Sequence, residues 1–258
     1  MNRLTSCVLV AVGVAVGPLR SATPAPDVTS LLAKVTTETA SVRIQVLKDL
    51  VAMGDDGIVA VAKELVEPKA GEVAKDAGAR MALHGMAVYV TRPGAEKERA
   101  AYVKKTLSLL DSDRPAAIKK FLVEQLQIAG RDEAVLGLAG CLKDKELAES
   151  ARQALEANPT DAAVVALRHA LAKAQGTLRV GIINSLGRRC DKESVKALVA
   201  EAKSSDEAVR CAALVALGRI GDPAARPVIE AALNSDSKAE KRSATEANLL
   251  LSKASVKR

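Results

Sequence analysis

The chain has 258 residues, which is long enough to bury a substantial core, and it carries a formal net charge of +7. Apolar residues make up 48% of the sequence but aromatic residues only 1%, namely Tyr89, Tyr102 and Phe121. The core must therefore be built from Ala, Val and Leu, which favours closely packed helices over a β-sandwich or barrel. A charge excess of this size indicates solubility and at most a weak attraction to anionic surfaces.

The N-terminus has the pattern of a secretory signal. Met1-Asn2-Arg3 is positively charged, residues 4–17 are uncharged and largely apolar, and a segment rich in Pro, Ser and Ala follows. The apolar run has about 14 residues, whereas a membrane span needs roughly 20. We therefore expect residues 1–25 to be a signal peptide with its exit segment, and residues 26–258 to form an exported domain, periplasmic or extracellular, without a membrane span after cleavage. An uncleaved anchor and a chance apolar terminus stay open as alternatives.

A pattern of apolar and basic residues is repeated along the chain. Residues 208–222 align with residues 177–191 at an offset of 31, and also with residues 41–55, and each copy keeps a basic residue, the apolar spacing and a terminal Asp. Residues 117–130 supply a further copy. The basic residue recurs at Arg43, Arg80, Lys119, Arg152, Arg179, Arg210 and Arg242. Repetition at spacings of 27 to 39 residues indicates an array of helical hairpins.

Each repeat is expected to contain two helices joined by a short turn. Apolar residues recur on one face of the first helix, and Gly221 can end such a helix in the left-handed conformation. The Asp that follows, Asp222 or its equivalent Asp191, is placed to accept the N–H groups that open the second helix, and Pro223 fits its first turn. The second helices are predicted over residues 56–66, 100–110, 133–142, 161–171, 192–202 and 223–233.

One hairpin of this size cannot bury its own apolar stripe, so neighbouring hairpins must stack into an all-α solenoid. Residues 204–233, SSDEAVRCAALVALGRIGDPAARPVIEAAL, resemble the HEAT repeat, in the short HEAT-like form also found in phycobilin lyases. The resemblance extends over nearly all of the chain from about residue 28 onward, and it is weakest over residues 77–110 and 146–175. It implies a right-handed α-solenoid of about six to seven HEAT-like helical hairpins.

The resemblance also implies a structural role for the repeated basic residues. In the family, an Asp before the first helix and an Arg within it form a ladder across neighbouring repeats. Asp206 with Arg210 matches this pattern, and Asp113 with Lys119 matches it more loosely. We therefore expect these side chains to hold helix starts and neighbouring repeats together rather than to bind a ligand.

The residues that could carry catalysis or metal binding are few and scattered. His84 and His169 lie in different repeats, without Cys, Asp or Glu at metal-ligand spacing. The His-Glu pairs that bind iron in HEAT-like hydroxylases do not occur, nor does a phosphate-binding glycine motif. Cys141, Cys190 and Cys211 are irregularly spaced and are expected to be free thiols, with Cys190, beside two arginines, as a minor candidate for a reactive one. We predict no enzyme, and no catalytic residue, cofactor or metal.

Basic pairs are spread along the chain, at Lys104-Lys105, Lys119-Lys120, Arg188-Arg189 and Lys241-Arg242. Acidic residues interleave with these pairs, aromatic residues that could stack on bases are almost absent, and an exported chain does not meet DNA. We therefore predict no nucleic-acid partner.

The remaining interpretation is a non-catalytic exported scaffold that binds a protein or peptide partner on the solenoid surface. Because the resemblance implies that second helices line the concave face, we expect partner contacts from their solvent-facing side chains: Lys63, Lys104, Arg168, Lys196, Arg226 and Glu230. The alternative is an accessory repeat module of a periplasmic sugar-degrading or cytochrome system, which exported Ala-rich HEAT-repeat chains also resemble. A lyase-like or nucleic-acid-binding role ranks below both, and the oligomeric state stays open.

Overall fold

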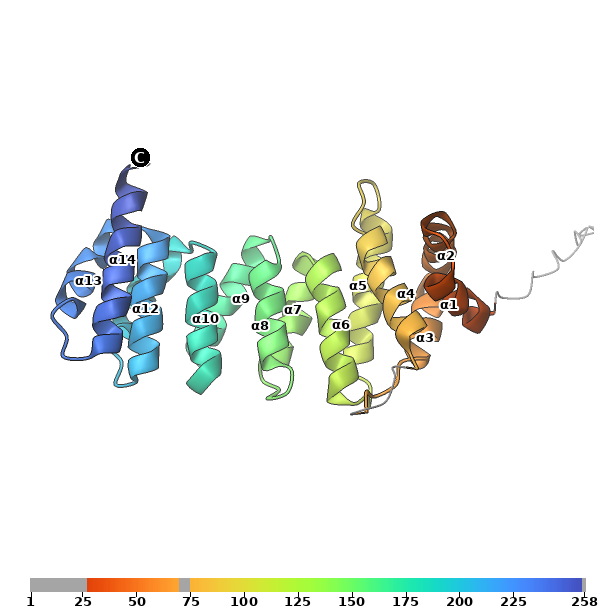
Figure 1. The fold of residues 1–258 in the computed structure, drawn as a ribbon, viewed down its shortest axis with the longest axis horizontal. Helices are drawn as coiled ribbons and strands as arrows, with labels where there is room; N and C mark the ends of the chain where they lie inside the picture. The colour runs from red at the N-terminus through yellow and green to blue at the C-terminus, as the bar shows by residue number, and fades with distance from the viewer. Residues whose placement is uncertain (1–26, 70–74, 257–258) are drawn as a thin grey trace, which may run out of the picture.

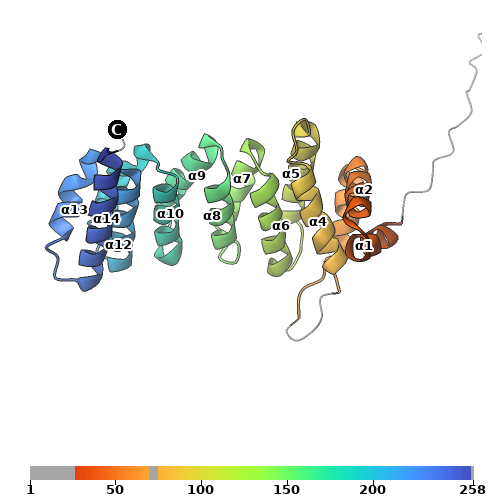
Figure 2. The ribbon, with the colours of Figure 1, turned by 45° about the horizontal axis from the view of Figure 1, so that its top comes forward.

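The computed structural model describes residues 27–69 and 75–256. Every regular element in these residues is a helix, and the helices form a single row from α1 to α14 (Figures 1 and 2). The all-α solenoid predicted from the repeats is confirmed. The predicted signal peptide and exit segment, residues 1–25, lie outside the described residues. None of the described helices is both long and apolar enough to cross a membrane.

The row consists of helix pairs preceded by α1, Val28–Thr37. The first helices are α2 (Ala40–Ala52), α4 (Ala77–Tyr89), α6 (Ala116–Ala129), α8 (Ala148–Ala157), α10 (Gly176–Arg188), α12 (Glu207–Ile220) and the terminal α14 (Lys238–Val256). The second helices are α3 (Asp55–Lys63), α5 (Glu96–Leu110), α7 (Asp132–Cys141), α9 (Asp161–Leu171), α11 (Val195–Glu201) and α13 (Arg226–Ala232). Short 3-10 turns, η1 (Lys192–Ser194) and η2 (Pro223–Ala225), lead into α11 and α13.

The helices are arranged in two layers that enclose one continuous core. First helices pack on neighbouring first helices, and most second helices pack on neighbouring second helices. Equivalent leucines from successive repeats fill the space between the layers: Leu186 and Leu217 of the first helices, and Leu167 and Leu198 of the second helices, are fully buried. The predicted apolar stripe of each hairpin is therefore buried by the neighbouring hairpins that stack on it. A single hairpin could not remove this stripe from water.

The first helices approach each other more closely than the second helices do, and glycines make this possible. A Cβ at Gly187 of α10 would lie 2.7 Å from the Cα of Ala216 on α12. A Cβ at Gly218 of α12 would lie 2.5 Å from the Cα of Ala247 on α14. In the other layer, α11 meets the next repeat through the short turn η2. The spacing between repeats is thus smaller on the side of the first helices.

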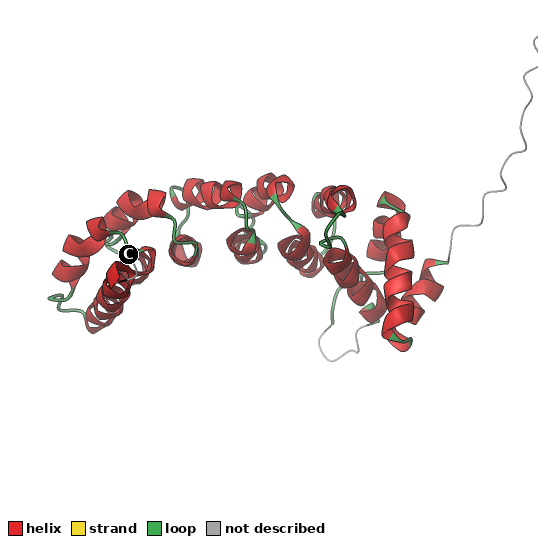
Figure 3. Cartoon of the chain, turned by 90° about the horizontal axis from the view of Figure 1, so that it is seen from above, coloured by secondary structure: helices red, strands yellow, loops and turns green. Residues whose placement is uncertain are grey.

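This difference in spacing bends the row. Figure 3 shows an arch with α4, α6, α8 and α10 along its inner side and α5, α7 and α9 along its outer side. The expectation that second helices line the concave face is therefore wrong for this chain. Small residues at the contacts between first helices shorten that layer, so the array curves toward it.

The turn of the best-preserved repeat has the predicted chemistry. Gly221 ends α12 with a φ of 73°, and the carboxylate of Asp222 accepts a hydrogen bond from the N–H of Ala224 at 2.9 Å. Pro223 lies in the first turn of η2, as predicted. Each of these residues acts on its own chain neighbours, which is why the sequence pattern alone could identify them.

The equivalent turn of the preceding repeat differs. Cys190 takes the position of Gly221 and keeps the left-handed conformation, with a φ of 52°. Asp191 accepts a hydrogen bond from the Ser194 hydroxyl rather than from a backbone N–H, and it forms an ion pair with Arg168 of α9. The prediction that Asp191 caps the second helix is therefore wrong, because a cation of the neighbouring repeat engages its carboxylate.

The second helix α5 also begins earlier than predicted, at Glu96 instead of residue 100. Glu96 and Glu98 lie in its first turn, where carboxylates interact favourably with the positive end of the helix dipole.

The helix α14 is the last one in the row. Its residues Ala244, Ala247 and Leu251 are buried, while Lys241 and other polar residues face solvent.

Candidate partner-binding surface

The six residues predicted to contact a partner all lie in the outer layer of second helices and do not form one cluster. They come from α3, α5, α9, α11 and α13, and are therefore distributed along the length of the row. Five of them are exposed: Lys63, Lys104, Lys196, Arg226 and Glu230. Two of these, Arg226 and Glu230, face each other across one helical turn at 3.6 Å.

Arg168, the remaining predicted residue, is only half-buried and is already engaged in the structure. Its Nε lies 3.2 Å from Oδ2 of Asp191. By contrast, Lys63, Lys104 and Lys196 have no ion-pair partner among the described residues. These three lysines are therefore the predicted residues whose charge is available to a partner.

A row of equivalent outward positions runs across four neighbouring second helices. It contains Lys104 of α5, Leu136 of α7, Val165 of α9 and Lys196 of α11, each of which follows a buried valine. Leu136 is 86% exposed and Val165 is 39% exposed. The row, which we call the outer row, thus has an apolar centre between two lysines. Sequence reasoning missed Leu136 and Val165, although their place directly after the core valines marked them as outward-facing.

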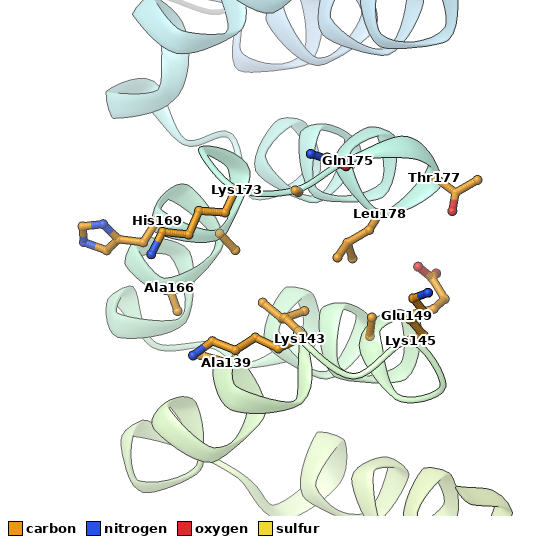
Figure 4. A pocket seen from close by; sticks show the side chains of 14 residues that line it. Ala139, Lys143, Lys145, Glu149, Ala166, His169, Lys173, Gln175, Thr177 and Leu178 are labelled. Atoms are coloured by element: carbon orange, nitrogen blue, oxygen red, sulfur yellow. The ribbon is translucent and has the colours of Figure 1, made fainter.

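Next to the centre of this row, a cavity of about 780 Å³ opens between the second helices α7 and α9 and the starts of the first helices α8 and α10 (Figure 4). Its floor is apolar and consists mainly of Ala139, Leu142, Ala166, Ala170 and Leu178. Its rim carries Lys143 and Lys173, from just beyond the C-terminal ends of α7 and α9, together with Lys145, His169 and Glu149. Figure 4 shows Lys143, Lys173 and His169 pointing toward the same side of the cavity. We call this site the α7–α9 groove.

The groove is open because a small residue lies where the next repeat has a carboxylate. When the sequence of α9 is aligned with that of η1 and α11, Ala170 takes the position of Glu201. In that next repeat, Glu201 accepts two hydrogen bonds from Arg179, at 2.9 and 2.7 Å, and this bidentate pair bridges α10 and α11. Ala170 cannot form the equivalent pair with Arg152 of α8, so the space at this junction stays unfilled.

Arg152 turns instead into the layer of first helices. It is 7% exposed, and it donates hydrogen bonds to Glu149, Glu156 and the hydroxyl of Ser185 on α10. Arg188 of α10 adds a hydrogen bond to Glu156 at 2.8 Å. These contacts join α8 to α10 by charge-assisted hydrogen bonds, and they satisfy a nearly buried cation.

The carboxylates of this cluster have lowered pKa values. Hydrogen bonding from Arg152 is the main cause for Glu149, whose pKa falls below its ordinary value of 4.5. Burial by itself raises the pKa of Glu156, but hydrogen bonds from Arg188, Ser185 and Arg152 outweigh burial and lower it. Both groups are therefore ionised at neutral pH and stabilise the folded state in that form.

Other repeated basic residues are structural as well. Arg80 of α4 pairs with Asp76, the residue before that helix, at 2.9 Å, whereas the predicted pair of Asp206 with Arg210 does not form. Asp206 caps α12 by accepting hydrogen bonds from the N–H groups of Ala208 and Val209. Arg210 pairs with Glu240 of the next repeat at 3.2 Å and donates to the carbonyl oxygen of Ser204 at 2.9 Å. Arg210 thus connects the start of its helix to the next repeat, as expected, but its acidic partner is Glu240 rather than Asp206.

The looser ladder pair does not form either. Asp113 and Lys119 make no ion pair in the part of the chain that the structure describes. The neighbouring Lys120 pairs instead with Glu146 at 3.0 Å. This contact connects α6 to the turn before α8, so a basic residue again links successive repeats.

The two histidines lie in separate places, as their positions in the sequence indicated. His84 lines a second, shallower cavity on the inner layer together with Phe121 and Gln125, and His169 lies at the rim of the α7–α9 groove. Over residues 27–69 and 75–256, no group of three or more His, Cys, Asp or Glu residues could hold a metal ion. Each histidine thus lines a separate cavity.

The described cysteines are free thiols. Cys141 is half-buried against the core, where burial raises the pKa of its thiol, with nearby Asp144 and Asp111 adding to the effect. Cys190 is exposed and Cys211 is half-buried. The packing of Cys141 on the core agrees with the interpretation from its apolar neighbours in the sequence.

Part of the chain matches a known repeat family. Residues 164–249, which extend from α9 into α14, match the family of HEAT repeats. Similar solved structures include human deoxyhypusine hydroxylase in complex with glycerol, with 16% sequence identity, 88% of this chain and 96% of that chain covered, and a TM-score of 0.37. The complex of CpcE and CpcF of phycocyanin lyase from Nostoc sp. PCC7120 has 17% identity, covers 95% of this chain and 97% of that chain, and has a TM-score of 0.37. No curated protein matches the chain. The protein is an α-solenoid of the HEAT-like kind, and its C-terminal third carries recognisable HEAT repeats.

Proposed function

We propose that this protein is a non-catalytic scaffold that binds a protein or peptide partner on its solenoid surface after export from the cytoplasm. The observation that carries the proposal is the outer row, in which Leu136 and Val165 are exposed between Lys104 and Lys196. Apolar side chains that are exposed side by side on a rigid repeat surface are typical of interaction sites. Lysines on either side would give such a site a polar rim.

The distribution of charges supports the same conclusion. The basic residues that recur from repeat to repeat, such as Arg152, Arg179 and Arg210, are engaged in contacts that hold the stack together. Lys104 and Lys196, in contrast, have no ion-pair partner among the described residues. Lys104 lies one repeat before Leu136, and Lys196 lies one repeat after Val165, at equivalent positions. A partner would be recognised by these variable outward positions, since the repeated inward ones serve stacking.

The export part of the proposal depends on the sequence of residues 1–25, with its charged start, apolar run and small-residue exit. Mass spectrometry of the chain recovered from the periplasm or medium tests it. We expect a mature N-terminus within or just after the exit segment. A chain that stays in the cytoplasm with an intact N-terminus would contradict export without affecting the binding proposal.

The binding proposal is tested by immobilising the full chain, capturing partners from the exported fraction of the producing cells, and measuring affinity with the purified components. We expect the K104E/K196E variant to bind at least about tenfold more weakly, because both charges flanking the outer row are reversed. K97E/K253E makes the same change in net charge at exposed positions on α5 and α14 and serves as the control. Failure to capture any saturable partner, or equal binding by both variants and by a variant reversed at all six predicted positions, would refute the proposal.

A further inference from the structure

We propose that the α7–α9 groove binds an acidic peptide segment of the partner, with an apolar side chain on the alanine floor and carboxylates against the lysine rim. The inference rests on the proposed function and names the site and the chemistry of its ligand. Four properties of the groove support it: its size, its floor, the unpaired charge of its rim, and its continuity with the outer row.

The size and the floor of the groove suit the insertion of a partner's side chain better than contact with a flat surface. Its volume of about 780 Å³ lies in the range of cavities that enclose ligands, which is roughly 300 to 1,000 Å³. The floor is made by short apolar side chains, chiefly Ala139, Ala166 and Ala170, which are half-buried in the free protein. Covering this floor would remove apolar surface from water without the need to displace a polar group.

The rim carries positive charge that the protein itself does not neutralise. Lys143, Lys145 and Lys173 are exposed, and none has an ion-pair partner among the described residues. Glu149, the acidic residue of the rim, accepts hydrogen bonds from Arg152 and from Gln153 and is therefore already engaged. The charge left for a ligand is positive, so the complementary ligand is an anion.

The neighbouring junctions do not offer the same combination. In the next repeat, formed by α10 and α11, the bidentate pair of Arg179 with Glu201 lies at the corresponding position. The cavity between the α11 and α13 repeats has Lys203 on its rim together with Glu240. Among the described junctions compared, an apolar floor beneath several unpaired lysines thus belongs to the α7–α9 groove.

The groove continues into the outer row, and this favours a chain-like ligand over a compact one. Leu136 lies two helical turns before Lys143 on the α7 side, and Val165 lies two turns before Lys173 on the α9 side. The seven residues from Leu136 to Lys143 cover about 10 Å along the helical path, which an extended peptide spans with about three residues. The ligand is therefore a segment in which one or two large apolar residues lie about three positions from a pair of Asp or Glu residues.

Selection of random 12-residue peptides displayed on phage, with the full chain as bait, tests this inference. Selected peptides are synthesised with a fluorescent label, and their affinity is measured by anisotropy at low and high salt. We expect acidic residues near Leu, Ile or Phe to be enriched and binding to weaken as salt rises, because screening reduces the attraction to the lysine rim.

Two groove variants separate charge from shape. K143E/K173E reverses the rim and leaves the floor unchanged, whereas A170L fills the floor and leaves the charge unchanged. Each should weaken the selected peptides by about tenfold or more, and K97E/K253E, the control with the same net charge as the first variant, should leave binding within about twofold of the native chain. Lys143 and Lys173 are exposed, so K143E/K173E remains a valid test even if A170L perturbs folding.

The outcomes that would overturn the inference are distinct from those that refute the scaffold function. Selected peptides that lack acidic residues, or that bind the K143E/K173E variant as tightly as the native chain, would show that the groove is not the binding site. The scaffold function would still hold in that case if partner capture were weakened by K104E/K196E. Competition by free glutarate as strong as by the peptide would assign the groove to a small dicarboxylate and overturn the peptide proposal. Failure of the selection to yield any binding peptide would also overturn it.

Discussion

Gly218 of α12 lies against the backbone of Ala247 on α14, and a Cβ at Gly218 would lie 2.5 Å from the Cα and 2.6 Å from the carbonyl oxygen of Ala247. Gly187 and Ala216 repeat the relationship one repeat earlier. Backbone atoms cannot rotate out of the way as side chains can. The first helices α10, α12 and α14 therefore pack at a distance that only glycine permits, on the inner side of the curved array (Figure 3).

We expect Gly218→Ala to destabilise the protein by about 1 to 3 kcal/mol, the usual effect of overpacking, even though alanine is the better helix former by about 1 kcal/mol. Urea unfolding followed by circular dichroism measures the change. The matched control is Gly140→Ala on α7, where an added Cβ meets nothing within 4 Å. There we expect a gain of a few tenths to about 1 kcal/mol. Equal effects at the two sites would contradict the proposed close approach.

Leu217→Asp should unfold the C-terminal end of the array while the N-terminal repeats stay folded. Leu217 is fully buried in α12, and burying an unpaired carboxylate there costs more than the local packing can offset. Because each repeat contacts only its neighbours, the damage should remain local. Hydrogen exchange measured by mass spectrometry should show lost protection in α12 to α14 and retained protection in α4 to α6. A chain that melts as before, or that loses protection uniformly, would contradict the solenoid interpretation.

Cys190→Gly should stabilise the protein by about 1 kcal/mol, because Cys190 adopts a left-handed conformation that costs non-glycine residues of order 1 to 2 kcal/mol. Its side chain is exposed, so little packing is lost. Thermal unfolding under reducing conditions measures the change. Cys190→Ala is the control, since it removes the thiol but keeps the unfavourable conformation. If alanine stabilises as much as glycine does, the strain is not in the backbone.

Stability should fall in acid through Glu149 and Glu156. Both have pKa values below the ordinary 4.5 in the folded state, so the unfolded chain binds protons first as the pH decreases. Their contribution is therefore complete above pH 4.5 and is lost as the pH falls through the lower pKa values of the folded state. Urea unfolding between pH 7 and pH 3 should show this decline.

Glu156→Gln isolates the contribution of that carboxylate. We expect it to lower the free energy of unfolding at pH 7 by about 2 kcal/mol, because hydrogen bonds to charged partners are lost, and to flatten the decline in acid. Glu64→Gln, at an exposed carboxylate with no ion pair among the described residues, is the control and should leave the pH profile unchanged. A Glu156→Gln profile parallel to that of the native chain would show that this carboxylate is not linked to folding.

Much of the fold follows from the sequence because its signals act over a few residues. The apolar stripe ending in Leu217, the left-handed Gly221 and the helix-opening Asp222 each concern neighbours along the chain, and each is found in the structure as predicted. Repetition of the stripe then requires stacking, since one hairpin leaves its apolar face in water. The all-α solenoid was therefore determined by the sequence alone.

The curvature of the row and the α7–α9 groove depend on how one repeat meets the next, and only the tertiary structure decided them. The side toward which the row bends is set by close contacts such as Gly218 with Ala247, between residues 29 positions apart. The groove exists because Ala170 lies where the next repeat has Glu201, so that Arg152 turns to Ser185 on another helix. Contacts of this kind depend on distances and side-chain directions between separate helices, which local propensities do not encode.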